Sequence, residues 1–123
     1  MEINEITQTI IGCAIRVHTA LGPGLLESAY HRCLVHELKK IGVGVESQVS
    51  LPIIYDGVKI DAAYRVDLRV EGSVLVEVKA VETVLPVHHT QLLSYLQLSK
   101  IHLGLLLNFN VVHMRDGIKR LIR

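Results

Sequence analysis

Three charged residues near the middle of the sequence, Asp67, Glu77 and Lys79, have side chains that could act together on a substrate. They lie on two runs of alternating polar and apolar residues, 64–70 and 74–81. A short glycine-containing segment separates the runs, a pattern typical of a β-hairpin. The hairpin brings the acid of the first run close to the acid and the lysine of the second.

The apolar residues of the two runs determine how the hairpin pairs. One register keeps them all on a single face, through the pairs Val70 with Val74, Leu68 with Val76, and Val66 with Val78. A slip by one residue would place Val66 opposite Glu77, so side-chain parity favours the first register. That register also places Asp67 opposite Glu77, and Arg65 opposite Lys79.

Such a hairpin has like charges opposite one another, which destabilises a sheet by a few tenths to about 1 kcal/mol per pair. Diagonal ion pairs, Asp67 with Lys79 and Arg65 with Glu77, would recover part of this free energy on a solvated face. A cation between the two carboxylates explains the arrangement better. The apolar neighbours of Glu77 and Lys79 also indicate partial burial, where charges need partners.

The oxygen ligands available here suit a hard divalent cation. Mg²⁺ prefers carboxylate and carbonyl oxygens and keeps several of its waters. We expect Asp67, Glu77 and the Val78 carbonyl to bind the ion, with Glu27 as a further or water-mediated ligand. Lys79 would lower the pKa of a metal-bound water and neutralise a phosphate. The predicted chemistry is metal-assisted phosphodiester hydrolysis.

Two helices are expected before the strands that carry these residues. Residues 3–21 have the spacing of one apolar helix face, and Gly22-Pro23-Gly24 ends the helix. The expected stripe is Ile6, Ile10, Cys13, Ala14, Val17 and Leu21. A second helix is expected over about 25–41, with the stripe Leu26, Tyr30, Cys33, Leu34, Leu38 and Ile41. Both cysteines are expected as buried free thiols. Glu27 lies beside the second stripe, where a surface acid that compensates the helix dipole is the alternative.

Residues 43–70 are predicted as two long strands joined at Asp56-Gly57, a strong two-residue turn signal. The expected pairs are Tyr55 with Val58, Ile53 with Ile60, Leu51 with Ala62, and Val49 with Tyr64. Their parity matches that of Val66, so one apolar face should run unbroken over three strands. Pro52 cannot donate to a ladder, which places the first strand at the sheet edge.

A third helix and a buried strand are expected after the hairpin. Residues 85–99 carry Pro86 near the start, as helices favour. Leu92, Leu93 and Leu96 form the expected core side, and His88, Gln91 and Tyr95 lie on another side. The apolar run 103–109 is predicted to pair parallel with 74–80, in a right-handed βαβ unit. The tail is predicted to form a small hairpin turning at Asp116-Gly117.

The composition limits the classes of protein. The 123 residues are enough for one domain, so we expect residues 1–123 to form a single α/β domain. Thirteen Lys and Arg against twelve Asp and Glu leave the charge near zero, so nucleic acid would bind through a local patch. No run approaches a membrane span and no signal sequence is evident, which predicts a soluble cytoplasmic protein. The seven histidines fit no common zinc spacing.

Three motifs, taken together, carry a family resemblance. Asp67 followed by Glu77-x-Lys79 across a hairpin resembles the signature of the PD-(D/E)XK nuclease superfamily, with Val66 in place of the usual proline. The segment Gly24-x-x-Glu27-x-x-Tyr30 resembles the motif that names the GxxExxY proteins, a branch of that superfamily. Gln91-x-x-x-Tyr95 is similar to the motif on the helix after the catalytic strand in the lambda-exonuclease-type branch.

The resemblance covers nearly the whole chain and implies both a fold and an activity. The implied fold is a single-domain, restriction-endonuclease-like αβββαβ core, a mixed sheet flanked by helices. The implied activity is cleavage of DNA with Mg²⁺ or Mn²⁺. The implied catalytic residues are Asp67, Glu77, Lys79, Glu27, Gln91 and Tyr95.

Two other functions stay open. A catalytically silent nuclease-fold module could bind nucleic acid or a protein partner, and the near-neutral charge favours it, or else a homodimer that pools two surfaces. The complete set of Glu27, Asp67, Glu77 and Lys79 favours the nuclease, because a silent module is free to lose such residues. A small-molecule metallohydrolase is disfavoured, since the sequence suggests no deep apolar pocket.

Overall fold

A mixed five-stranded sheet forms the centre of the computed structural model, which describes residues 1–61 and 64–123. Its strand order is β1-β4-β5-β6-β7. The strands are β1 (Val45–Ser50), β4 (Arg65–Val70), β5 (Val74–Lys79), β6 (Leu103–Asn108) and β7 (Ile118–Ile122). Strands β5 and β6 are parallel, and the other neighbours are antiparallel. The βαβ unit predicted from the apolar run is therefore confirmed.

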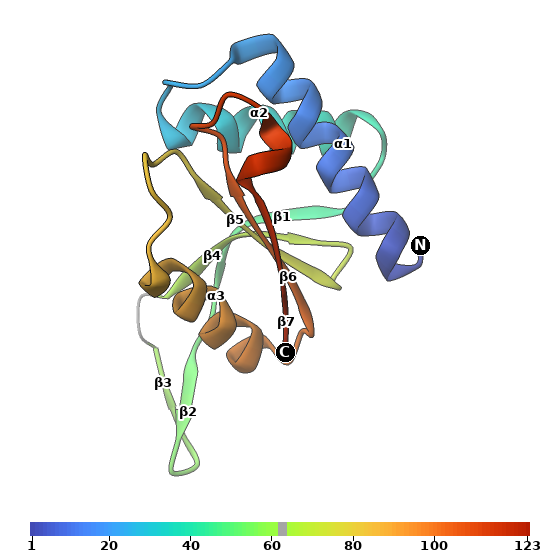
Figure 1. Ribbon diagram of the computed structural model, residues 1–123. Helices are drawn as coiled ribbons and strands as arrows, with labels where there is room; N and C mark the ends of the chain where they lie inside the picture. Colours follow the sequence, from blue (N-terminus) through green and yellow to red (C-terminus); the bar gives the residue numbers. More distant parts are fainter. Residues whose placement is uncertain (62–63) are drawn as a thin grey trace.

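Helices cover both faces of this sheet (Figure 1). Helices α1 (Ile3–Leu21) and α2 (Glu27–Lys40) lie on one face, and α3 (Pro86–Ser99) lies on the other. The α/β class with flanking helices is confirmed. In the part of the chain that the structure describes, no helix has the length and hydropathy of a membrane span.

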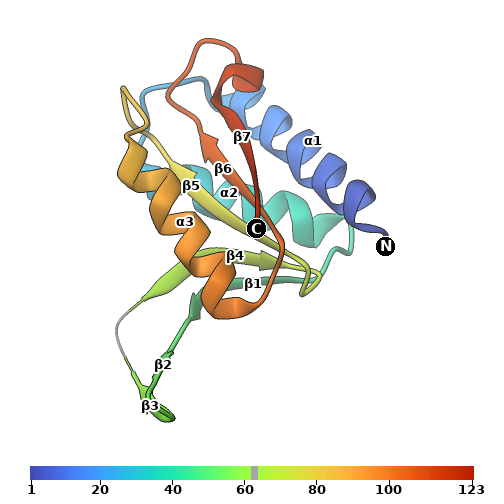
Figure 2. The same cartoon turned by 60° about the horizontal axis from the view of Figure 1, so that its bottom comes forward.

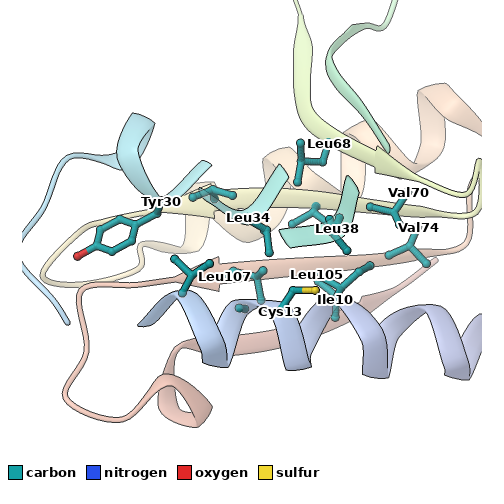
Figure 3. Close-up of a cluster of buried hydrophobic side chains, with 14 of the residues drawn as sticks. Ile10, Cys13, Tyr30, Leu34, Leu38, Leu68, Val70, Val74, Leu105 and Leu107 are labelled. Atoms are coloured by element: carbon teal, nitrogen blue, oxygen red, sulfur yellow. The ribbon is translucent and has the colours of Figure 1, made fainter. Parts of the chain in front are cut away.

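The larger hydrophobic cluster joins α1 and α2 to the sheet (Figure 3). Its fully buried members include Ile10, Cys13, Leu34, Leu38, Leu68, Val70, Val74, Leu105 and Leu107. Burying one such aliphatic side chain stabilises the fold by about 1.5–3 kcal/mol. A smaller cluster lies beneath α3 and contains Val66, Leu75, Leu92, Leu96 and Leu106. Strand β5 thus contributes to both hydrophobic clusters, and this well-packed strand carries Glu77 and Lys79.

Most residues of the expected helical stripes are buried, but four of them are exposed. The side chains of Leu21, Leu26, Ile41 and Leu93 are exposed, contrary to the prediction. Leu26 and Ile41 are the cap residues of α2, which begins two residues later than expected, so neither continues the buried face. Cys13 and Cys33 are both free thiols as predicted, although only Cys13 is fully buried.

Residues 53–60 form a separate hairpin, which we call the arm. Strands β2 (Ile53–Tyr55) and β3 (Val58–Ile60) pair as predicted around Asp56-Gly57. The arm projects away from the sheet (Figures 1 and 2), and its apolar side chains are mostly exposed. The prediction of two long strands with one unbroken apolar face is therefore wrong.

The register changes between the arm and the main sheet. Val49 lies opposite Val66 rather than Tyr64. The Leu51 N–H donates to the Tyr64 carbonyl at 2.9 Å, while the predicted pair of Leu51 with Ala62 lies outside the described residues. The pairs of the arm and those of the main sheet thus differ in register by two residues. Strand β1 lies at the sheet edge, as Pro52 predicts.

The C-terminal segment differs from the predicted hairpin. A short 3₁₀ helix, η1 (Met114–Gly117), occupies the expected turn, and β7 pairs with β6 instead of with the tail itself. Leu107 lies opposite Ile118, and Leu103 lies opposite Ile122. The apolar strand β6 gains its second neighbour in this way, so its backbone groups are paired on both sides.

Candidate active site

Strand β4 is interrupted at Asp67. Its ladder with β1 lacks the pair with Gln48, whose backbone has a φ of 54° in the left-handed region. Its ladder with β5 ends at the pair Leu68–Val76. Val66 packs beneath α3, whereas Leu68 packs beneath α1 and α2, so the strand changes faces between them. The predicted register is confirmed up to Leu68, and the prediction that Val66 shares the face of Leu68 is wrong.

Two side-chain hydrogen bonds replace the missing ladder. The Val78 N–H donates to Asp67 Oδ2 at 2.8 Å. The Asp67 N–H donates to Glu77 Oε1 at 2.8 Å. Each carboxylate therefore accepts a backbone amide from the other strand. The two acids lie beside one another as the register predicts, but through reciprocal hydrogen bonds rather than across an intact ladder.

Within residues 1–61 and 64–123, the second oxygen of each carboxylate has only a long contact with a basic group. Asp67 Oδ1 lies 4.0 Å from His31 Nδ1, and Glu77 Oε2 lies 3.9 Å from Lys79 Nζ. Both distances exceed those of good hydrogen bonds. These two oxygens are consequently available to a further ligand. The sequence analysis missed His31, whose position one helical turn after Glu27 was the available signal.

The three carboxyl groups of the site all have raised pKa values, and burial is the largest cause for each of them. Burial, followed by the nearby charge of Asp67, raises the pKa of Glu77 from 4.5 to about 7. Burial raises the pKa of Asp67 despite the hydrogen bond from Val78. Burial also raises the pKa of Glu27, against the opposing effect of Lys79. Three carboxyl groups with raised pKa values mark a place where a cation would relieve the electrostatic cost.

Glu27 reaches this site from the first residue of α2. It lines a cavity of about 470 Å³ together with Asp67, His31 and Arg32. Tyr30, one turn later, fixes the connection that precedes Glu27. Its hydroxyl donates to the Gly22 carbonyl at 2.6 Å and accepts from the Leu25 N–H at 3.1 Å.

The ring of Tyr30 is held as firmly as its hydroxyl. It stacks on Phe109, with ring centroids 4.7 Å apart and planes 8° from parallel. Figure 3 shows the hydroxyl at the margin of the buried cluster. The tyrosine thus ties the turn at Gly22 and Leu25 to the start of the helix. Sequence analysis placed Tyr30 in the core and missed this second role.

Gln91 and Tyr95 lie on α3, on the opposite side of the sheet from α2. Tyr95 is only 6% exposed. Its pKa is raised first by burial and then by the charges of Glu77 and Asp67, which places it near the carboxylates. Gln91 is exposed and lines a second cavity with Tyr95 and Tyr64. Among the described residues, Gln91 makes no hydrogen bond to either carboxylate.

Asn108 holds the chain just after the candidate lysine. It lies opposite Lys79 in the parallel ladder and is 4% exposed. Its Nδ2 donates to the Val81 carbonyl at 2.9 Å, and its Oδ1 accepts from the Val81 N–H at 3.1 Å. We call this arrangement the Asn108 clamp. A polar amide at the end of an apolar run was the signal for it in the sequence.

The donor atoms suit a hard divalent cation, although they do not form a complete cage. Over residues 1–61 and 64–123, no three His, Cys, Asp or Glu side chains meet in a metal-binding group. Mg²⁺ is usually bound by one or two carboxylates and keeps several waters. Asp67 Oδ1 and Glu77 Oε2, which have only long contacts among the described residues, could supply such ligands. Val78 contributes its amide to Asp67, so a role for its carbonyl stays a prediction. The Nδ1 of His88 accepts a hydrogen bond from the Leu85 N–H at the start of α3.

A comparison with protein families bears on this geometry. Residues 4–121 match the family model of the PD-(D/E)XK nuclease superfamily. The chain belongs to the PD-(D/E)XK superfamily. Neither the curated proteins nor the solved structures gave a match. The fold is of the α/β restriction-endonuclease-like class, and PD-(D/E)XK proteins are generally nucleases that typically use divalent metal ions on nucleic acid.

Proposed function

We propose that this PD-(D/E)XK protein hydrolyses phosphodiester bonds of DNA with Mg²⁺ or Mn²⁺. The observation that carries the proposal is the pair of carboxylates on the interrupted strand. Asp67 and Glu77 each fix one oxygen on a backbone amide and direct the other toward a basic side chain. Preorganised oxygens in a partly buried niche are what binding of a hard cation requires.

The residues of the site have distinct proposed roles. Asp67 Oδ1 and Glu77 Oε2 would hold the ion, and Glu27 would approach it from α2 directly or through water. A bound divalent ion supplies Lewis acidity toward the phosphate and lowers the pKa of water. Lys79, on the same strand as Glu77, would bind a phosphate oxygen and offset its charge. Tyr95 and Gln91 would contact the substrate from the α3 side.

Cleavage of DNA by the purified protein tests this proposal. Single-stranded and duplex DNA are incubated with Mg²⁺, with Mn²⁺ or with EDTA. Glu77→Gln and Asp67→Asn keep an oxygen acceptor for the backbone amide, so they remove charge while preserving the local hydrogen bonds. We expect each of them, and Lys79→Ala, to lower kcat by about a hundredfold or more.

Lys119→Ala on the exposed face of β7 is the matched control and should cleave like the wild type. Full activity in EDTA, or in folded Glu77→Gln, would contradict the metal-dependent mechanism. Circular dichroism of each variant establishes that it is folded.

A binding module without catalysis is the second candidate. The reciprocal hydrogen bonds favour it, because they give Asp67 and Glu77 a structural role that needs no metal. On this hypothesis the wild type binds DNA or a protein partner but does not cleave DNA under any metal condition. The same assay, with DNA binding measured in parallel, separates the two.

We further infer that the chain is a GxxExxY-type protein acting in the cytoplasm, with residues 1–123 as a single nuclease-like domain. The Tyr30 contacts with the turn before Glu27 support the motif assignment. The near-neutral charge supports a homodimer that combines two DNA-binding surfaces. Sedimentation with and without DNA tests the dimer.

A further inference from the structure

A second cavity lies between α3 and the base of the arm. Its volume is about 630 Å³, and it borders the candidate active site through Tyr95. The residues that line it are Ile53, Tyr64, Thr90, Gln91, Leu93, Ser94, Tyr95, Gln97 and Leu98. The arm supplies Ile53, the segment before β4 supplies Tyr64, and one face of α3 supplies the rest. The position between the arm and α3 can be followed in Figure 2.

The lining of this cavity is neutral, aromatic and rich in amides. None of the described residues that line it carries a charge. By contrast, Glu27, His31, Arg32 and Asp67 line the cavity on the α2 side. Phosphates bind to charged groups, whereas nucleobases stack on aromatic rings and form hydrogen bonds with amides. The cavity on the α2 side thus suits a phosphate, and the cavity beside α3 suits a nucleobase. The carboxylate pair lies between them.

The exposed ring of Tyr64 provides a surface on which a base can stack, beside the buried ring of Tyr95. The rings of Tyr64 and Tyr95 have centroids 6.5 Å apart and planes 55° apart, so they do not stack on each other. Tyr64 is 44% exposed, and its ring remains accessible from the cavity. Gln91 and Ser94 are exposed on the adjacent face of α3, where their side chains can reach the edge of a base.

We propose that this cavity binds an unpaired nucleobase next to the scissile phosphate, so that the substrate is a single-stranded or frayed end of DNA. The proposal rests on the nuclease function proposed above and specifies its substrate. Bases inside a duplex stay stacked on their neighbours, and taking one out costs a few kcal/mol. Single strands carry no such cost, so the cavity would select them.

Binding without metal tests the proposal apart from cleavage. The chain has no tryptophan, so Tyr64→Trp introduces a single fluorescent reporter into the cavity. In EDTA, oligo-dT is titrated against an abasic oligonucleotide of equal length and charge, and against duplex DNA. We expect oligo-dT to quench the tryptophan and to bind about 5- to 150-fold more tightly than the abasic strand.

Unlabelled variants show whether Tyr64 causes the preference. Tyr64→Ala should remove the preference for bases, because it removes the exposed ring that lines the cavity. Tyr55→Ala is the matched control, since Tyr55 is an exposed tyrosine on the arm that does not line the cavity. It should bind like the wild type.

Three results would overturn the proposal. The first is equal affinity of the wild type for oligo-dT and the abasic strand. The second is unchanged base preference in folded Tyr64→Ala. The third is a dimer that Tyr64→Ala converts to monomers with no effect on DNA affinity, because the cavity would then be an interface between copies. Base-dependent binding without cleavage in Mg²⁺ would support the base site and contradict the nuclease function, so the two failures are distinguishable.

Discussion

Glu77 combines two requirements that oppose each other. The residue is only 5% exposed, yet its proposed task needs the charged form. The Asp67 amide stabilises that charged form through a hydrogen bond, while burial and the charge of Asp67 disfavour it. Burial prevails, and the pKa of Glu77 lies near 7 in the metal-free fold. A cation at the site would reverse the balance, so protonation and metal binding should compete for this carboxylate.

The raised pKa of Glu77 makes stability depend on pH. In the unfolded chain this carboxyl loses its proton near 4.5, and in the folded protein near 7. Between these values the folded state binds the extra proton, so the free energy of unfolding falls as pH rises. We expect a loss on the order of 3 kcal/mol between pH 4.5 and 7. Urea melts in EDTA at pH 5 and pH 8 measure it.

Glu77→Gln is the control for this effect, because it retains the oxygen that accepts the Asp67 amide and cannot titrate. Over the same pH range, the free energy of unfolding of Glu77→Gln should fall much less than that of the wild type. Parallel curves for the variant and the wild type would mean that Glu77 titrates normally.

The turn before α2 shows how one side chain can organise an element. Tyr30 connects Gly22 and Leu25 through its hydroxyl and is anchored by its ring on Phe109. The helix itself begins without a side-chain cap at Leu26. The tyrosine therefore performs part of the work of a cap, and it does so from inside the helix.

Tyr30→Phe should lower the free energy of unfolding by about 1–2 kcal/mol. The variant keeps the stacked ring but removes one donor and one acceptor from partly buried backbone groups. Tyr55→Phe, which removes an exposed hydroxyl, should change stability by less than about 0.5 kcal/mol. Chemical denaturation compares the two. Equal effects would show that the hydroxyl contacts contribute nothing.

The arm and the sheet differ in how much they contribute to stability. Ile54 on the arm is exposed, whereas Leu68 on β4 is fully buried. Ile54→Ala should therefore change stability by less than about 0.5 kcal/mol, and Leu68→Ala should cost about 2–5 kcal/mol. Thermal melts give both values. A large loss for Ile54→Ala would indicate that the arm is covered in solution.

The elements that sequence predicted well are those whose packing is regular. The middle of α1, strands β5 and β6, and the turn at Asp56-Gly57 follow directly from periodicity and turn chemistry. The interruption at Asp67 could not be predicted, because parity assumes that a strand keeps its faces. Val66 changes faces there, and the carboxylates replace the ladder. The meeting of Asp67 and Glu77 was thus predicted, but the hydrogen bonds that hold them were not.

At the scale of the whole molecule, the carboxylate pair couples metal binding to folding. The site draws on α2, β4 and β5, and the unfolded chain does not assemble it. Any ion that binds only the folded state stabilises it by mass action. Because Asp67 and Glu77 repel each other when both are charged, the metal-free fold should be the less stable form at neutral pH.

Mg²⁺ or Mn²⁺ should therefore raise the melting temperature of the wild type. The stabilisation is about 2.7 kcal/mol when the free ion is at a hundredfold excess over its Kd. Asp67→Asn and Glu77→Gln should melt higher than the wild type in EDTA and respond little to either ion. Scanning calorimetry at several ion concentrations measures this. The same metal response in all three proteins would exclude the carboxylate pair as the binding site.

The Asn108 clamp has a consequence for hydrogen exchange. The amides of Val81 and Asn110 lie outside the strands, yet both donate to the buried Oδ1 of Asn108, at 3.1 and 3.2 Å. They can exchange with solvent only when these hydrogen bonds open at the ends of β5 and β6. Their slow exchange would then measure how often the segment behind Lys79 opens. Two loop amides would thus report the opening frequency of the strand ends that hold the lysine.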